Sequence, residues 1–217
     1  MTFAAGNADA IGYLVLAHLF VANISGNTVQ AGIALSHGDW RDAFLRGFTV
    51  PMLAIAAFAG ALLPFRARGT PLLLESLLLA VFIFSGHRAH LADPSVAIGY
   101  GTVVGFGALL VFAVGIQNAT LTTDDGGLRG TTFVTGVVAN IGDFAAQYLQ
   151  MRSGDPAKAK ERAAKAQRYL LMFAGYLAGG VAGALLYLQW SIDALWVTVL
   201  IVLVAAGIVY RHPQAES

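Results

Sequence analysis

Two apolar stretches of this 217-residue chain carry side chains that could bind a small polar solute or an ion. Amides and hydroxyls donate and accept hydrogen bonds, and a glycine beside a hydroxyl residue lets a membrane helix unwind locally and expose backbone N–H and C=O groups. We expect Ser25–Gly26–Asn27 and Thr135–Gly136 to form the centre of such a site. The expected binding residues are Ser25, Gly26, Asn27, Thr28, Gln30, Asn118, Thr132, Thr135, Gly136 and Asn140. Alternatively, these residues pack helices together and bond across the interface.

Three acidic residues are candidate proton carriers. Glu75 is flanked by leucines on both sides, and Asp143 lies in another apolar stretch, where an ionised carboxylate is costly. The alternative for each is a position near enough to the surface to reach water or, for Glu75, Arg68. Asp9 is the third candidate. Together with Asn118 it is expected at the outer end of a membrane span, where it would cap a helix or line the external mouth.

The composition places these residues in a membrane protein. Hydrophobic residues make up 57% of the chain, charged residues 12%, and the mean hydropathy is +0.69, which soluble domains of this size rarely reach. The net charge of +1 hides an uneven distribution of charge, but no basic face large enough for nucleic acid remains once the helices are assigned. The absence of cysteine excludes disulfides, thiolate nucleophiles and Cys-based metal sites. The expected partners are therefore the lipid bilayer and a small polar solute or ion. Self-association stays open, and we expect neither nucleic acid nor a cofactor.

Hydropathy predicts seven membrane helices in a single domain over residues 1–217, so the expected fold is an all-α polytopic bundle. The predicted spans are Leu19–Ser36, Phe48–Phe65, Pro71–Gly86, Val96–Ala119, Thr131–Gln150, Tyr169–Leu188 and Ile192–Tyr210. Asp155-Pro156 has the sequence of an N-cap and first helical residue, and the charged stretch up to Arg168 favours helix. We therefore expect the sixth span to extend out of the membrane. Met1–Ala10 lacks the positive region of a cleavable signal peptide and is expected to stay in the mature protein.

The basic residues predict the orientation. With seven spans, ten of the 13 basic residues share one side, and the other three lie opposite. The larger group is Arg41, Arg46, Arg88, Arg152, Lys158, Lys160, Arg162, Lys165, Arg168 and Arg211; the smaller is Arg66, Arg68 and Arg129. Because Lys and Arg gather on the cytoplasmic side, we expect a cytoplasmic C-terminus and an external N-terminus.

The second half of the chain repeats the first. The matched segments are Gly6–Ala10 with Gly115–Ala119, Ser25-Gly26 with Thr135-Gly136, and Gly60–Leu63 with Gly183–Leu186. The residue spacing of the last match also pairs Glu75 with Thr198 and Arg88 with Arg211. We expect two parallel three-helix repeats, residues 1–90 and 120–217, joined by a linking helix at 91–119 and related by an axis along the membrane normal. Packing needs alone would explain the recurring small residues, but not the match of Asp9 with Asn118.

The combined motifs resemble a known family. Gly-x-x-Asp-Ala, Ile24–Thr28, Gly115–Ala119 and Thr131–Gly136 resemble the YoaK-like family of bacterial integral membrane proteins of unknown function, over essentially the whole chain. The resemblance implies a bacterial inner membrane but no particular chemistry. Members carry an apolar stretch before the first motif, whereas here only Met1–Ala5 precedes it. We therefore expect the chain to lack one leading helix or to begin at an internal start.

Enzyme signatures are missing from the sequence, which contains no His-Glu-x-x-His, phosphate-binding loop or Gly-x-Ser-x-Gly. His87, His90 and Asp93 could bind a metal in principle, but we do not expect them to. The prediction is a small secondary transporter, a permease with a site between the first and fifth spans and optional proton coupling, and not an enzyme. The alternatives are a non-transporting binding or sensory protein and, if Asp143 or Glu75 has a catalytic partner, an intramembrane enzyme.

Overall fold

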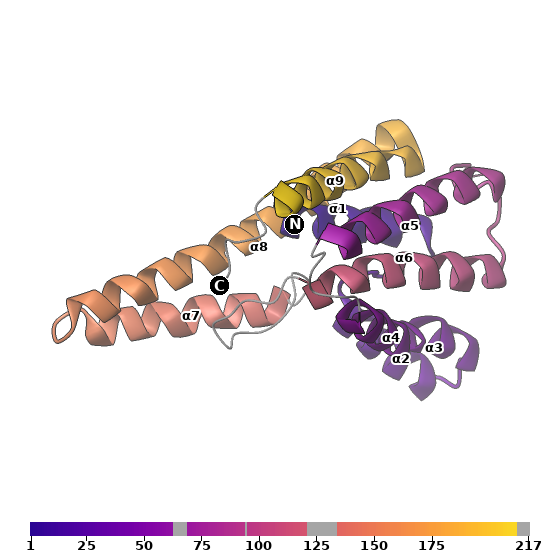
Figure 1. Cartoon of the computed structure of the whole chain (residues 1–217). Coiled ribbons are helices and arrows are strands. Elements are labelled where there is room, and N and C mark those ends of the chain that lie inside the picture. Colours follow the sequence, from indigo (N-terminus) through magenta and orange to yellow (C-terminus); the bar gives the residue numbers. More distant parts are fainter. Residues whose placement is uncertain (63–68, 94, 121–133, 212–217) are drawn as a thin grey trace.

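The computed structural model describes residues 1–62, 69–93, 95–120 and 134–211, and the side chains of 118–120 are not described. The regular elements in these ranges are all helical, which confirms the all-α class (Figure 1). The helices are α1 Thr2–Val15, α2 Ile24–Ser36, α3 Trp40–Gly47, α4 Thr49–Leu62, α5 Gly69–Arg88, α6 Tyr100–Thr120, α7 Val134–Met151, α8 Pro156–Trp190, the 3-10 turn η2 Ser191–Ala194, and α9 Leu195–Arg211.

Four stretches of the described chain are long and apolar enough to cross a membrane. They are Trp40–Leu62, Gly69–Arg88, Tyr100–Gln117 and Pro156–Arg211, the last of which turns back at η2 and so contains both α8 and α9. These stretches overlap five of the seven predicted spans. Many of their large apolar side chains point outward, and Leu188, for example, is 80% exposed. An exposed apolar surface of this extent suits contact with lipid.

The first predicted span was wrong in its bounds. Leu19–Ser36 is not one helix, because residues 16–23 form a non-helical connecting segment and α2 begins only at Ile24. Ala17 and His18 both have positive φ values, 50° and 61°, which end α1 and reverse the chain. With 13 residues, α2 is not among the candidate spans, and neither is α7, which was predicted as the fifth span.

The residues before that span contain a helix that was not predicted. They form α1, and small residues on its buried side let it approach α8 closely. A Cβ atom added at Gly6 would overlap the Tyr176 carbonyl oxygen, and one at Gly179 would overlap the Phe3 carbonyl oxygen. Glycines spaced four residues apart, here Gly175, Gly179 and Gly183, allow this kind of contact between helices.

The prediction that the charged segment and the sixth span form one helix is confirmed. Asp155 is the N-cap of α8 and accepts a 3.1 Å hydrogen bond from the Lys158 backbone N–H, Pro156 follows in the first turn, and the helix continues unbroken to Trp190. Its first half pairs with α7 in a hairpin that extends away from the other helices (Figure 1). The hairpin holds the basic residues between Arg152 and Arg168.

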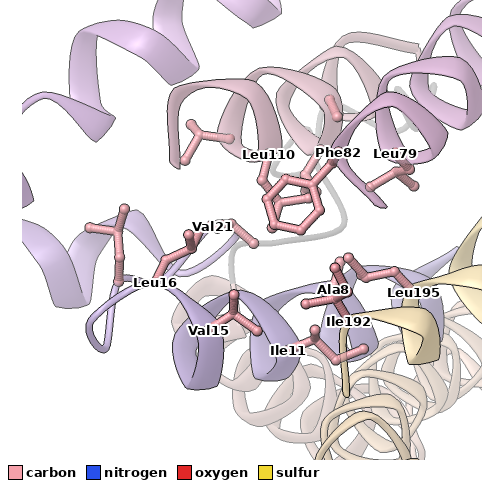
Figure 2. Close-up of a cluster of buried hydrophobic side chains, with 14 of the residues drawn as sticks. Ala8, Ile11, Val15, Leu16, Val21, Leu79, Phe82, Leu110, Ile192 and Leu195 are labelled. Atoms are coloured by element: carbon pink, nitrogen blue, oxygen red, sulfur yellow. The ribbon is translucent and has the colours of Figure 1, made fainter. Parts of the chain in front are cut away.

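The core lies where α1, the connecting segment, α5, α6 and the start of α9 meet. Figure 2 shows Phe82 of α5 beside Leu110 of α6, with Ile11 of α1 and Ile192 and Leu195 nearby. Their side chains are fully buried. Because lipid is as apolar as these residues, close packing rather than escape from water holds this region together.

Candidate functional site

A pocket of about 240 Å³ lies between α2, α4 and α7. Its lining residues are Ala22, Asn23, Ile24, Ser25, Leu53, Val134, Thr135 and Gly136. The structure therefore brings together Ser25 from the first half of the chain and Thr135-Gly136 from the second. Ser25 and Thr135 are both exposed, so the pocket is open to the surroundings of the protein.

The first turn of α2 forms one wall of this pocket. Asn23 is the N-cap of α2, but its side chain makes no cap hydrogen bond; instead its Oδ1 accepts a bond of 2.9 Å from Ser25 Oγ. Two of the backbone N–H groups at this helix start already have partners, because Ile24 and Gly26 donate to the carbonyl oxygens of Ala22 and Asn23 at 3.1 Å each. The polar groups that this wall offers to a bound solute are therefore the side chains of Asn23 and Ser25.

Asp9 fixes the backbone behind this wall. Its Oδ1 accepts hydrogen bonds of 2.7 Å from the N–H groups of both Val21 and Ala22 and a longer one of 3.4 Å from Asn23, while Oδ2 accepts from the Tyr176 hydroxyl. Asp9 itself lies within α1 and is 5% exposed. It nevertheless binds N–H groups just before a helix, as a cap does, and it does not line the pocket.

Asn27 holds the same connecting segment from the other side. Its Oδ1 accepts from the Phe20 N–H at 3.0 Å, and its Nδ2 donates to the Phe20 carbonyl at 2.6 Å and to Thr49 Oγ1 at 3.2 Å. The side chain is fully buried and does not line the pocket. Asn27, a predicted binding residue, therefore stabilises the connecting segment.

The other predicted binding residues are spread over several places. Gly26 lies against the Phe20 ring, and the exposed Thr28 donates to the Ile24 carbonyl of its own helix. Gln30 borders a different depression at the far end of α2. Asn140 lies on α7 beyond the pocket, and its buried Nδ2 has no partner within the described part of the chain. Thr132 lies outside the described residues, and the Asn118 side chain is not described.

The two acidic candidates inside predicted spans have opposite surroundings. Glu75 on α5 is 1% exposed, and its Oε2 has no hydrogen-bond partner among the described residues. Asp143 on α7 is exposed, and its Oδ2 accepts a bond of 2.8 Å from Gln147. Arg68, the suggested partner of Glu75, lies outside the described residues.

The histidines near the end of α5 do not share a ligand set. His87 Nε2 lies 2.9 Å from Asp193 Oδ1 on η2, whereas Asp93 accepts from Ser95 Oγ at 2.6 Å and from the Ser95 N–H at 2.9 Å. These two bonds from Ser95 lower the pKa of the Asp93 carboxyl below its usual value. The residues in the described ranges form no cluster of three groups that could hold a metal ion.

Several residues that shape the site were missed from the sequence. Leu53 lines the pocket, and Tyr176 bonds to Asp9 from α8. Deeper in the protein, Thr198 Oγ1 donates to Asn7 Oδ1 at 2.8 Å. The Gly175, Gly179 and Gly183 spacing could have indicated that α8 receives another helix, but nothing in the sequence indicated that the helix is α1.

Comparisons with known proteins agree with this architecture. The family described as "Protein of unknown function (DUF1275)" matches residues 1–208. A relative from Rhizobium meliloti (strain 1021), UPF0700 transmembrane protein RA0705, is 27% identical over 215 residues, which cover 99% of this chain and 85% of the relative. No solved structure matches the chain significantly. With its long apolar helices, this is a multi-pass membrane protein in contact with the bilayer. The chain belongs to the DUF1275 family of transmembrane proteins, whose function is unknown.

Proposed function

We propose that this protein is a small permease of the bacterial inner membrane that moves a small polar solute through the pocket between α2, α4 and α7. The observation that carries the proposal is that Ser25 and Thr135-Gly136, from opposite halves of the chain, line one pocket. Transporters with internal repeats commonly bind their substrates where the repeats meet. The YoaK-like resemblance supports a location in a bacterial membrane, but it does not indicate which solute is moved.

The lining chemistry favours an uncharged solute over an ion. Asn23, Ser25 and Thr135 offer hydrogen-bond donors and acceptors, Leu53 and Ile24 offer apolar contact, and the described lining includes no charged side chain. An ion taken from water without a paired charge would be costly to bind. A volume of about 240 Å³ corresponds to several water molecules at about 30 Å³ each, so the solute should be small.

The proposed topology keeps two parallel repeats, seven crossings, an external N-terminus and a cytoplasmic C-terminus. The helix packing supports the repeats. Gly6 of α1 meets Tyr176 of α8, and Gly115 of α6 meets Leu53 of α4. The offset that pairs Gly60 with Gly183 makes Leu53 the counterpart of Tyr176, while a shorter offset pairs Gly6 with Gly115. In this arrangement α1 packs as the predicted linking helix does, but with 14 residues it is not among the candidate spans and adds no crossing to the seven.

Proton coupling is the second part of the proposal. Glu75 supports it, because a buried acidic side chain within a candidate span is a functional candidate by default. Asp143 gives weaker support, since it is exposed and bonded to Gln147. We also propose that the protein is not an enzyme, because no second candidate catalytic group is bonded to Glu75 in the described residues.

The proposal is tested by a thermal-shift screen of purified protein with amino acids, sugars, polyols and nucleosides. A solute at about 100 times its Kd should stabilise the folded state by about 2.7 kcal/mol. The shift should be lost in Thr135→Leu and kept in the control Thr28→Val, whose side chain lies outside the pocket. The compound should then be taken up by proteoliposomes.

Each other result points to a different function. A shift that survives Thr135→Leu would contradict the pocket as the binding site. Binding at the pocket without uptake would favour the binding or sensory alternative. Conversion of the compound by the purified protein would favour an intramembrane enzyme.

A further inference from the structure

We propose that Asp9 and Tyr176 form a positioning pair that keeps the two walls of the pocket at a fixed separation, an inference that rests on the proposed function of that pocket. Neither side chain lines the pocket, but Asp9 accepts hydrogen bonds from the backbone N–H groups of the lining residues Ala22 and Asn23. The pair acts through the backbone of the connecting segment on one side and through α8 on the other.

Asp9 holds the first wall in addition to α2, whose Ile24 and Gly26 N–H groups donate to the carbonyl oxygens of Ala22 and Asn23 at 3.1 Å each. Ala22 and Asn23 line the pocket but lie in the connecting segment, before the first turn of α2. Asn23 provides no side-chain cap, and the segment starts with the positive-φ pair Ala17 and His18. Asp9 Oδ1 binds the N–H groups of Val21 and Ala22 at 2.7 Å each. Moving this carboxylate therefore moves the wall.

The second wall is the start of α7, and its position depends on the packing of α7 against α8. Val134, Thr135 and Gly136 start α7, which packs along α8 in an antiparallel hairpin. Phe144 of α7 stacks on Tyr169 of α8 with ring centroids 5.6 Å apart. Both helices rise about 1.5 Å per residue, so the start of α7 lies roughly level with Gly179, within one turn of Tyr176. A bond from the Tyr176 hydroxyl to Asp9 Oδ2 thus ties the two walls together.

The repeat shows that helix packing does not require this bond. The counterpart of Tyr176 is Leu53, and the counterpart of Asp9 is Asn118. Gly115 still approaches α4, where a Cβ atom would lie 2.6 Å from Ala56 Cβ and 3.2 Å from Leu53 Cδ1. Leucine has no hydroxyl, so the close contact of α6 with α4 forms without the bond that joins α1 to α8. The Asp9–Tyr176 bond is thus an addition specific to the half that braces the connecting segment.

The test measures the wall separation directly and needs no solute. In this Cys-free chain, Ser25→Cys and Thr135→Cys are introduced together, and the rate of cross-linking by a short thiol-specific bifunctional reagent is measured in full-length protein. Tyr176→Phe should lower the rate by about fivefold, the factor that corresponds to one net hydrogen bond. Tyr187→Phe, a change on the same helix away from Asp9, should leave the rate unchanged. Combining Tyr176→Phe with Asp9→Asn should lower it no further than the stronger single change.

A rescue comparison separates the positioning role from a merely structural one. Asp9→Asn keeps an oxygen for the Val21 and Ala22 N–H groups and should cross-link faster than Asp9→Ala. If Asp9→Ala does not fold, the cross-linking rate of Tyr176→Phe still tests the positioning pair, because this substitution removes only one oxygen atom. A Tyr176→Phe protein that cross-links at the unaltered rate would overturn the positioning pair. If the cross-linking results support the Asp9–Tyr176 pair but no solute ever binds the pocket, the proposed permease is contradicted and the positioning role is kept.

Discussion

Thr198 on α9 donates a hydrogen bond of 2.8 Å to Asn7 Oδ1 on α1, joining the two ends of the chain inside the protein. Both side chains are buried, with Asn7 fully so and Thr198 1% exposed. Hydrogen bonds between membrane helices contribute about 0.6 kcal/mol on average and up to about 1.7 kcal/mol. This bond belongs to the upper part of that range, because a buried amide oxygen would otherwise lose its partner.

Thr198→Val tests this bond, since valine keeps the shape and removes the hydroxyl. We expect the free energy of unfolding to fall by about 1 to 2 kcal/mol, measured by reversible unfolding in mixed micelles. Thr28→Val is the control, because the Thr28 hydroxyl is exposed and bonds within its own helix. Equal stability of the two variants would show that the bond contributes little.

The glycines between α1 and α8 give a second prediction. Gly179→Ala should destabilise the protein by about 1 to 3 kcal/mol, because its Cβ atom would overlap the Phe3 carbonyl oxygen, and the backbones must separate. Gly207→Ala on α9 is matched in chemistry but meets nothing within 4 Å. It should instead be neutral or stabilising by up to about 1 kcal/mol. Thermal unfolding of the two purified variants in one detergent provides the comparison.

The surroundings of Glu75 lead to opposite expectations for stability and activity. Replacing a buried polar group that lacks a full set of partners with a hydrocarbon of similar size is often neutral or stabilising. Glu75→Leu should therefore keep or raise the thermal unfolding temperature. Glu75→Gln should abolish the pH dependence of uptake in proteoliposomes, because an amide cannot titrate. Unchanged pH-dependent uptake in the double variant Glu75→Gln with Asp143→Asn would end the proposal of proton coupling by these residues.

The orientation is open to labelling, because the chain has no cysteine of its own. Single cysteines at Gly126 and at Ala163 should react with a membrane-impermeant maleimide from opposite faces, the first from outside and the second from the cytoplasm. The reason is the clustering of Lys and Arg around Ala163. Labelling of intact cells and of inverted vesicles gives the two measurements. Reaction of both positions from one side would contradict the proposed topology.

Sequence patterns predicted best where one local signal decides the structure. Asp155 and Pro156 marked the start of α8 because capping depends on neighbouring residues. The α1 helix was missed because its small, weakly apolar residues become a buried surface only against α8, far along the chain. The sequence also could not show that Ser25 lines the pocket whereas Asn27 braces the connecting segment. Both are polar residues near the start of α2, and only the path of residues 16–23 separates their positions.

The packing of α1 against α8 and of α4 against α6 also constrains how the protein can be made. Each half of the chain places its first helix on a helix of the other half, so α1 and α4 lack these partners until the second half has been synthesised. Asp9 is synthesised early and meets Tyr176 only after most of the chain has been synthesised. The nascent first half must therefore wait, shielded by lipid or by the insertion machinery, until the second half arrives. Two fragments divided between α5 and α6 should accumulate only when they are produced together in the same cell.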